Sequence, residues 1–234
     1  LQKKVNGVLL MGQTILTPKQ LKFLELIQNE PQITKRFYLT GGTPLAEFYL
    51  RHRLSEDIDL FCEKEEINPR VTDAYLKKVS PKLLVSKIKR SQFLGLISYQ
   101  LVFKDKQELK VDFNYYPFPR IEKGIKYQNL EVDSVYDIAV NKLHTLFMKP
   151  RNRDYVDLYF IMTKFKYPLP KLITDAKAKF DWDIDPVNLA NQFLRVKDIE
   201  QADFPKMLIP FDKKTLEGFF FQQAKLLEKR IFRQ

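Results

Sequence analysis

The stretch YLTGGTPLAEFYLRHRLSEDIDLF, residues 38–61, contains the strongest structural signals in this chain. It places two adjacent glycines shortly before an Asp-Ile-Asp, in a chain that has only 7 glycines. The segment 36–40 is typical of a short strand, 43–52 of a helix that begins with a Thr-Pro pair, and 57–62 of a second strand. The order predicts a strand, a glycine turn, a helix and a strand that begins at two carboxylates.

Gly41 and Gly42 lie between the first of these strands and the helix. Without a Cβ atom, their backbone can approach a ligand closely and adopt dihedral angles that other residues avoid. The backbone amides that follow, at the start of a helix, form a cradle for phosphate groups. A tight strand-to-helix turn without a ligand is the simpler alternative use of such a pair.

The two carboxylates, Asp57 and Asp59, project to the same side of their strand, because residues two apart in a strand share a face. Ile58 and Leu60 are then expected to face the core. Two carboxylates on one face repel each other unless a cation lies between them, and Mg²⁺ suits the position because it takes oxygen ligands. Asp112, in a later predicted strand, is a third candidate and would complete a two-metal site. The alternative is a strand face that is only solvated.

The remaining pattern predicts an α+β architecture with a mixed sheet. A helix begins at Thr17, and the segments 92–104 and 108–116 form an antiparallel hairpin. Helical patterns follow at residues 134–149, 153–165, 168–180, 186–197 and 213–231. We therefore expect an α/β core over residues 1–120 and a helical region over residues 121–234 that completes the active-site cleft.

Charged residues interrupt the apolar stripes of two consecutive predicted helices. Lys142 falls in the middle of the first stripe, and Arg153 and Asp157 fall inside the second. Such side chains must be paired, reach along the surface to water, or line a pocket. One interpretation is a buried salt bridge from Lys142 or Arg153 to Asp157. The other is that both cations contact nucleotide phosphates, while Asp157 positions Lys142 or acts on an acceptor hydroxyl. His144 falls on the polar side and is interpreted as a surface residue.

Composition narrows the class of protein. Lys and Arg number 40 against 29 Asp and Glu, which gives a net charge of +11 and favours polyanionic partners such as nucleic acid, nucleotides or an acidic protein. The single cysteine, Cys62, excludes an internal disulfide and is expected to be a small buried residue. Because the sequence has no long apolar run, we expect no membrane insertion and a cytoplasmic protein.

Four motifs occur in a fixed order: GGTPLAEFYLRHRLSEDIDLF, KVDF, DIAVNKLHTLF and RNRDYVDLYFI. Together they resemble the AbiEii/AbiGii-type toxin nucleotidyltransferases, which include the MenT toxins and have a DNA-polymerase-β-like core. The resemblance runs from about residue 36 to residue 165. It implies a nucleotidyltransferase core with a mixed β-sheet flanked by helices, followed by a C-terminal helical region.

The resemblance also implies roles for individual residues. It implies a phosphate-holding glycine pair followed by Thr43 in place of serine, and a metal-binding aspartate pair. It also implies a functional lysine, Lys142, in the motif DIAVNKLHTLF, and a closing Arg-Asp…Asp motif formed by Arg153, Asp154 and Asp157. The catalytic candidates are Asp57, Asp59, Asp112, Lys142 and Asp157. The nucleotide-binding candidates are Gly41, Gly42, Thr43, Arg53, Ser55, Lys142 and Arg153. The metal-binding candidates are Asp57, Asp59 and Asp112.

The implied activity is a metal-dependent transfer of a nucleoside monophosphate from an NTP to an acceptor hydroxyl, with release of pyrophosphate. Mg²⁺ or Mn²⁺ is the implied cofactor, and the 3′ end of tRNA is the implied acceptor. Members of the family are typically toxins of bacterial toxin–antitoxin systems, so a cognate antitoxin protein is a candidate partner. The alternatives are a protein or small-molecule acceptor, or a non-catalytic basic binding module.

Overall fold

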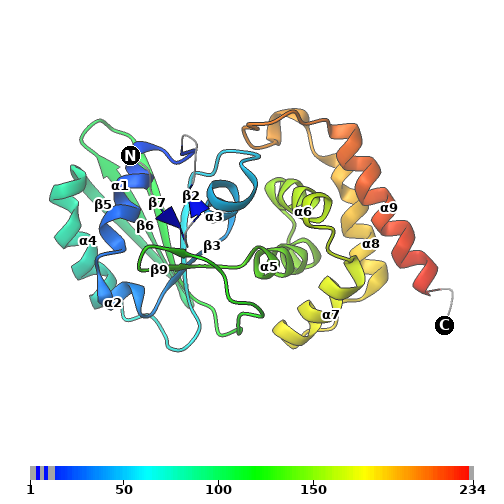
Figure 1. The fold of residues 1–234 in the computed structure, drawn as a ribbon, viewed down its shortest axis with the longest axis horizontal. Coiled ribbons are helices and arrows are strands. Elements are labelled where there is room, and N and C mark those ends of the chain that lie inside the picture. The colour runs from blue at the N-terminus through cyan, green and yellow to red at the C-terminus, as the bar shows by residue number, and fades with distance from the viewer. Residues whose placement is uncertain (1–3, 6–7, 10–13, 232–234) are drawn as a thin grey trace. The chain divides into compact units, whose positions relative to one another are not determined.

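The structure is a computed structural model that describes residues 4–5, 8–9 and 14–231. The chain forms two compact units, and Figure 1 labels many of their helices and strands. The first unit contains the described residues up to 49 together with residues 55–134, and the second contains residues 50–54 together with the described residues from 135 onward. The short segment 50–54 therefore belongs to a different unit from the residues on either side of it.

The first unit is built on a mixed sheet, which in the described part of the chain has seven strands in the order β5-β6-β7-β4-β3-β9-β8. These are β3 (Tyr38–Thr40), β4 (Ile58–Cys62), β5 (Val85–Phe93), β6 (Leu96–Phe103), β7 (Glu108–Tyr115), β8 (Lys126–Tyr127) and β9 (Leu130–Val132), while β1 (Lys4–Val5) and β2 (Val8–Leu9) pair with each other. β4 runs parallel to β7 and antiparallel to β3. The strands that carry Asp59 and Asp112 are therefore direct neighbours, and the predicted α+β class with a mixed sheet is confirmed.

Helices α1, α2 and α4 cover one face of this sheet (Figure 1). Their bounds are Pro18–Ile27, Pro31–Thr34 and Pro69–Leu83. α1 begins as predicted: the Gln20 N–H donates to the Thr17 hydroxyl at 3.2 Å, and the Thr17 N–H donates to the Gln20 side chain at 2.9 Å. The apolar sides of α1 and α4 pack with alternate residues of the strands into one core, which includes Cys62, as predicted.

Between β3 and β4 the chain forms a short helix, α3 (Gly42–Pro44), that continues directly into a π-helix, η1 (Leu45–Leu50). The helix predicted over 43–52 is therefore present, but most of it has the wider π-type hydrogen bonding. π-Helical turns are rare and occur frequently at functional sites.

The described part of the second unit is helical. Its helices are α5 (Val135–Met148), α6 (Asn152–Phe165), α7 (Leu169–Phe180), α8 (Pro186–Leu194), the 3₁₀ turns η2 (Arg195–Asp198) and η3 (Gln201–Asp203), and α9 (Lys213–Ile231). Backbone hydrogen bonds attach segment 50–54 to this unit: the Leu54 N–H donates to the Lys206 carbonyl at 2.9 Å, and the Leu208 N–H donates to the His52 carbonyl at 2.8 Å. In the described chain, no helix combines the length and the apolar character that a membrane span requires.

Three strands of the sheet were not predicted. β5 lies at the edge of the sheet, and most of its side chains are exposed, so it lacks the alternation of apolar and polar residues that marks a half-buried strand. β8 and β9 are too short to show a pattern. The segment predicted as one strand, 92–104, is interrupted by a turn at Leu94, where φ is +48°. Since β8 and β9 follow residue 120 and pair into the sheet, the first unit extends to residue 134.

Candidate active site

The glycine turn packs against one of the predicted aspartates. Gly41 follows the last residue of β3 and has a φ of +83°, a conformation that favours glycine. A Cβ atom at this position would lie 2.7 Å from Oδ2 of Asp59, closer than such atoms approach each other. The missing side chain therefore lets the backbone of the turn lie directly beside the Asp59 carboxylate.

Substitution of Gly41 by alanine tests this close approach. We expect Gly41→Ala to displace the Asp59 carboxylate and to lose most of the activity of the protein, because both the φ angle and the 2.7 Å contact oppose a Cβ atom. Gly218→Ala is the matched control, since a Cβ atom on this α9 residue has no neighbour within 4 Å and alanine is about 1 kcal/mol better than glycine in a helix. Activity and thermal unfolding of both variants check the prediction, and an active Gly41→Ala protein would contradict it.

The hydroxyl of Thr43 ties the turn to the start of β4. This residue is buried, and its Oγ1 donates a short hydrogen bond to the carbonyl oxygen of Asp57. The resemblance implies a phosphate contact for this hydroxyl, whereas the structure gives it a partner within the protein. Thr43 therefore fixes the position of the Asp57 backbone relative to Gly41 and Gly42.

Asp59 of the Asp-Ile-Asp lies where the strand alternation predicted. Ile58 and Leu60 are fully buried in the core, and the half-buried Asp59 projects from the opposite face of β4. Asp57 precedes the strand by one residue and is also half-buried. The alternation therefore keeps the carboxylate of Asp59 out of the core and beside the glycine turn.

Asp112 on β7 is the register partner of Asp59 in the parallel pair β4–β7. This residue is 7% exposed, and its side-chain oxygens accept hydrogen bonds from Ser98 Oγ and Lys110 Nζ, both at 2.6 Å. Neither Ser98 nor Lys110 was among the predicted site residues. In the sequence, Lys110 is related to Asp112 only because residues two apart in a strand share a face. Ser98 lies in the other predicted strand of the hairpin, and only the strand alternation there indicates its face.

The ammonium group of Lys110 interacts electrostatically with all three aspartates. Burial lowers the pKa of its ammonium group, but the hydrogen bond to Asp112 and the negative charges of Asp112, Asp57 and Asp59 outweigh burial, so the pKa lies above its ordinary value. The three carboxylates therefore act on one ammonium group. The negative charges of these carboxylates therefore favour a cation beside them in the first unit.

The donor chemistry fits a hard divalent cation. The three aspartates supply carboxylate oxygens, which are the ligands that Mg²⁺ and Mn²⁺ bind. In the part of the chain that the structure describes, no group of three or more His, Cys, Asp or Glu side chains is arranged so that it could hold a metal ion by itself. Mg²⁺ commonly binds to one or two carboxylates and completes its shell with water and substrate phosphates, so these residues fit an ion that binds together with a nucleotide.

A second group of predicted residues forms a buried ionic network in the helical unit, centred on Asp157. Asp157 is fully buried, and Arg53 binds both its oxygens, with Nε 2.6 Å from Oδ1 and Nη2 2.7 Å from Oδ2. Lys142 Nζ lies 2.6 Å from Oδ2, and His52 Nε2 lies 2.8 Å from Oδ1. Burial raises the pKa of Asp157, but the charges of Lys142 and Arg53 and the hydrogen bonds hold it well below its usual value.

The same network continues to Asp154, which is also fully buried. Lys142 Nζ is 2.6 Å from Asp154 Oδ1, and Arg151 Nε is 2.8 Å from Asp154 Oδ2. Lys142, which fell on an apolar stripe in the sequence, is thus paired with two carboxylates. Arg151, at the N-cap of α6, enters this network, while Arg153 is half-buried.

Ser55 and His144 are two further residues for which the sequence made a prediction. Ser55 is half-buried, and its carbonyl oxygen accepts a hydrogen bond from Gln20 Nε2 at 2.7 Å. The interpretation of His144 as a surface residue was wrong, because its ring stacks on Phe180 at 3.9 Å and burial lowers its pKa. The predicted residues in the first unit are Gly41, Gly42, Thr43, Ser55, Asp57, Asp59 and Asp112, and those in the second are Arg53, Lys142, Arg153 and Asp157.

Comparisons with known proteins give a family and a fold. A sequence model of the family described as "Nucleotidyl transferase AbiEii toxin, Type IV TA system" matches residues 25–220. An uncharacterized protein of Aquifex aeolicus (strain VF5), aq_aa25, is 29% identical over 150 residues, which are 63% of this chain and 68% of that protein.

Two solved structures from Helicobacter pylori share the fold. JHP933 has a TM-score of 0.57 and 21% identity, covering 92% of this chain and 93% of that one. A protein described as a candidate nucleotidyltransferase has a TM-score of 0.59 and 20% identity, covering 93% and 98% of the two chains. At these sequence identities the structural similarity establishes only the fold. The nucleotidyltransferase activity is inferred from the family match.

Proposed function

Because the chain belongs to the family of AbiEii nucleotidyl transferase toxins of type IV toxin–antitoxin systems, we propose that it transfers a nucleoside monophosphate from an NTP to the 3′ end of tRNA in a metal-dependent reaction. The observation that carries the proposal is the parallel register that pairs Asp59 with Asp112, with the Gly41 backbone packed against Asp59. The net charge of +11 supports a polyanionic acceptor.

The residues of the first unit would act as follows. Asp57, Asp59 and Asp112 would hold Mg²⁺ or Mn²⁺, which when bound neutralises charge on the phosphates of the NTP and lowers the pKa of the attacking hydroxyl. The backbone at Gly41 and Gly42 would approach the triphosphate closely, since the Asp59 carboxylate lies directly beside the position where Gly41 lacks a Cβ atom. The protein's own contribution is mainly position and charge, as in other phosphoryl-type transfers.

The proposed reaction needs only the NTP and the acceptor hydroxyl as reactants. The oxygen of the acceptor hydroxyl forms a bond to the α-phosphorus of the NTP, and the bond between that phosphorus and the bridging oxygen to the β-phosphate breaks. Pyrophosphate leaves, and the hydroxyl proton passes to water on the Asp59–Asp112 face of the sheet. This face is supplied by β4 and β7, which the hydrogen-bonded sheet holds in fixed register.

We propose a positioning role for Asp157. A general base must reach the proton that it removes, but Asp157 is fully buried and both its oxygens already accept hydrogen bonds from cationic side chains. A carboxylate held well below its usual pKa by these charges is also a weak base. Its effect is to fix Lys142 and Arg53.

Labelling with total tRNA tests the proposed acceptor. Purified protein is incubated with each of the four NTPs, labelled at the α-phosphate, in the presence of Mg²⁺. We expect label in tRNA that is removed by a 3′ exonuclease, and none after EDTA is added. Label in protein bands or in small molecules would select the alternative acceptors, and absence of both transfer and Mg²⁺-dependent nucleotide binding would select a non-catalytic module. An antitoxin gene beside this one would support the proposed toxin–antitoxin pairing.

Removal of the Lys110 charge tests the proposed cation site. The Lys110 ammonium interacts with the same three carboxylates that would hold the ion, so we expect Lys110→Met to bind Mn²⁺ roughly tenfold more tightly than the wild type in calorimetric titration without NTP. Lys87→Met, on the exposed side of β5, is the matched control and should leave the affinity unchanged. Equal or weaker Mn²⁺ binding by Lys110→Met would show that the ion does not bind at these carboxylates.

A further inference from the structure

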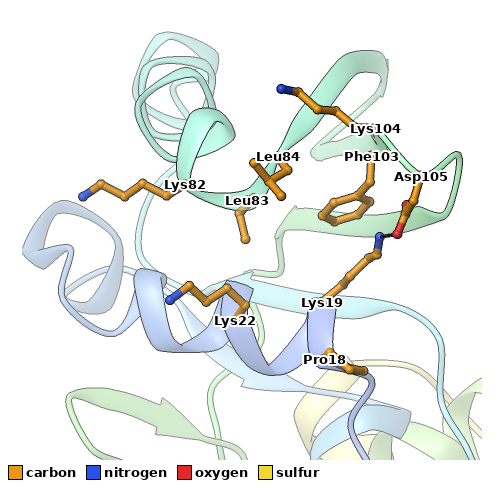
Figure 2. A pocket seen from close by; sticks show the side chains of 9 residues that line it. All are labelled: Pro18, Lys19, Lys22, Lys82, Leu83, Leu84, Phe103, Lys104 and Asp105. Atoms are coloured by element: carbon orange, nitrogen blue, oxygen red, sulfur yellow. Dashed lines mark hydrogen bonds and ion pairs between the residues drawn. The ribbon is translucent and has the colours of Figure 1, made fainter.

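A lysine-ringed pocket of about 320 Å³ lies in the first unit, between the start of α1, the end of α4 and the β6–β7 turn (Figure 2). It is lined by Pro18, Lys19, Lys22, Lys82, Leu83, Leu84, Phe103, Lys104 and Asp105. Phe103 is five residues along β6 from Ser98, the partner of Asp112, which corresponds to about 16 Å along a strand. The odd spacing also puts the two side chains on opposite faces of the sheet, so this pocket is separate from the carboxylates.

The walls of the lysine-ringed pocket are fastened to each other. The Lys104 N–H donates to the Leu84 carbonyl at 3.0 Å, which joins the turn after β6 to the end of α4. The Lys19 ammonium forms an ion pair with Asp105 and lies 4.1 Å from the centre of the Phe103 ring, which joins α1 to the same turn. Three elements distant in sequence therefore form a hollow whose shape is preset.

The charged residues that line this pocket are mostly positive. It has four lysines and one aspartate, and that aspartate, Asp105, is paired with Lys19. Lys22, Lys82 and Lys104 are exposed, and none has an ion-pair partner among the residues that the structure describes. Figure 2 shows their amino groups directed to the same side, whereas Lys19 points to Asp105. Across the chain the ratio is only 40 to 29, so the pocket concentrates positive charge well beyond the average.

The floor of the pocket is apolar. Leu83 and Phe103 are nearly buried, and Leu84 leaves 59% of its surface exposed at the rim. A ligand that suits both parts combines negative charges with an apolar face, as a nucleotide does with its phosphates and its base. The volume lies at the lower end of the range for small-ligand sites, which suits one nucleotide. An extended acidic peptide would seek backbone partners, but the Lys104 N–H and the Leu84 carbonyl are already bonded to each other.

We propose that the lysine-ringed pocket holds the acceptor RNA at a distance from the reaction, with Lys22, Lys82 and Lys104 on its phosphates and one unpaired nucleotide against Leu84. This proposal rests on the proposed function, and it specifies where an RNA acceptor is held. An adjoining hollow beyond the α4–β5 turn is lined by Lys77 and Lys87 and by no acidic residue. It extends the basic surface along which the RNA backbone continues.

The test is RNA binding by the triple variant Lys22→Gln, Lys82→Gln, Lys104→Gln. Fluorescence anisotropy with labelled total tRNA, without NTP, measures Kd at several salt concentrations. Each lost phosphate contact should reduce the slope of log K against log salt by about one, so we expect a slope smaller by up to about three and affinity reduced roughly 10- to 100-fold in moderate salt. The control carries the same three charge changes at exposed lysines of the second unit, Lys149, Lys197 and Lys214.

The outcomes separate this proposal from the catalytic one. Asp59→Asn should bind tRNA as the wild type does while losing transfer, so a failure of transfer leaves the pocket test intact. Equal losses of affinity in the triple variant and its control would overturn the pocket as a specific contact. A wild-type protein that transfers nucleotides but binds tRNA no differently from the triple variant would also overturn it. Loss of binding to an acidic protein partner with unchanged tRNA binding would assign the surface to that partner instead.

Discussion

Asp59→Asn is expected to lower nucleotide transfer by at least about a thousandfold, or roughly 4 kcal/mol of barrier. The amide has the shape of the carboxylate and fits beside Gly41, so the fold and the thermal unfolding temperature should change little. What is lost is the negative charge that, with its register partner Asp112, would hold the metal–NTP complex. Initial rates with α-labelled NTP measure the effect.

Glu66→Gln is the control for this substitution. Glu66 lies in the loop between β4 and α4 of the same unit and is exposed, so removal of its charge should leave the rate within about twofold of the wild type. If Asp59→Asn and Glu66→Gln transferred nucleotides equally well, the carboxylates of β4 and β7 would have no part in the reaction.

Asp157→Ala is expected to destabilise the protein by about 3–5 kcal/mol, because it leaves Arg53 and Lys142 buried without one of their shared counter-charges. The single tryptophan, Trp182, lies in the helical unit, and its fluorescence during urea unfolding reports the change. Glu217→Ala removes a surface pair with Lys213 and should cost less than about 1 kcal/mol.

The pH dependence of this contribution follows from the depressed pKa of Asp157. Its ionised form is favoured by folding, so the contribution is complete above the ordinary carboxyl pKa of 3.8 and is lost as the pH falls through the lower folded value. Wild type and Asp157→Ala should therefore converge in stability only in strong acid. An Asp157→Ala protein as stable as the wild type at neutral pH would contradict the network.

Local signals in the sequence predicted much of the fold and part of the site. The Thr17 capping box, the strand alternation around Ile58 and the glycine pair each act over a few residues, and each occurs in the structure as expected. Lys142 on an apolar stripe correctly indicated a charged side chain that needs a partner.

Other features depend on contacts between distant segments and left no local pattern. The pairing of Asp59 with Asp112 requires the register of two strands that are separated by α4, β5 and β6. The contribution of Arg151 to the network depends on the loop before α6, and the burial of the Thr43 hydroxyl depends on where β4 begins. β5 escaped prediction because an exposed edge strand needs no apolar alternation.

The position of the label in the products shows whether the protein transfers a nucleoside monophosphate through the carboxylates of β4 and β7. Wild-type protein with Mg²⁺ and tRNA is supplied in parallel with NTP labelled at the α-phosphate and NTP labelled at the γ-phosphate. We expect α-label to enter the RNA and γ-label to appear in pyrophosphate in equal amount, with both signals absent in Asp59→Asn. Label from the γ-position in the RNA, or α-label that Asp59→Asn still transfers, would contradict it.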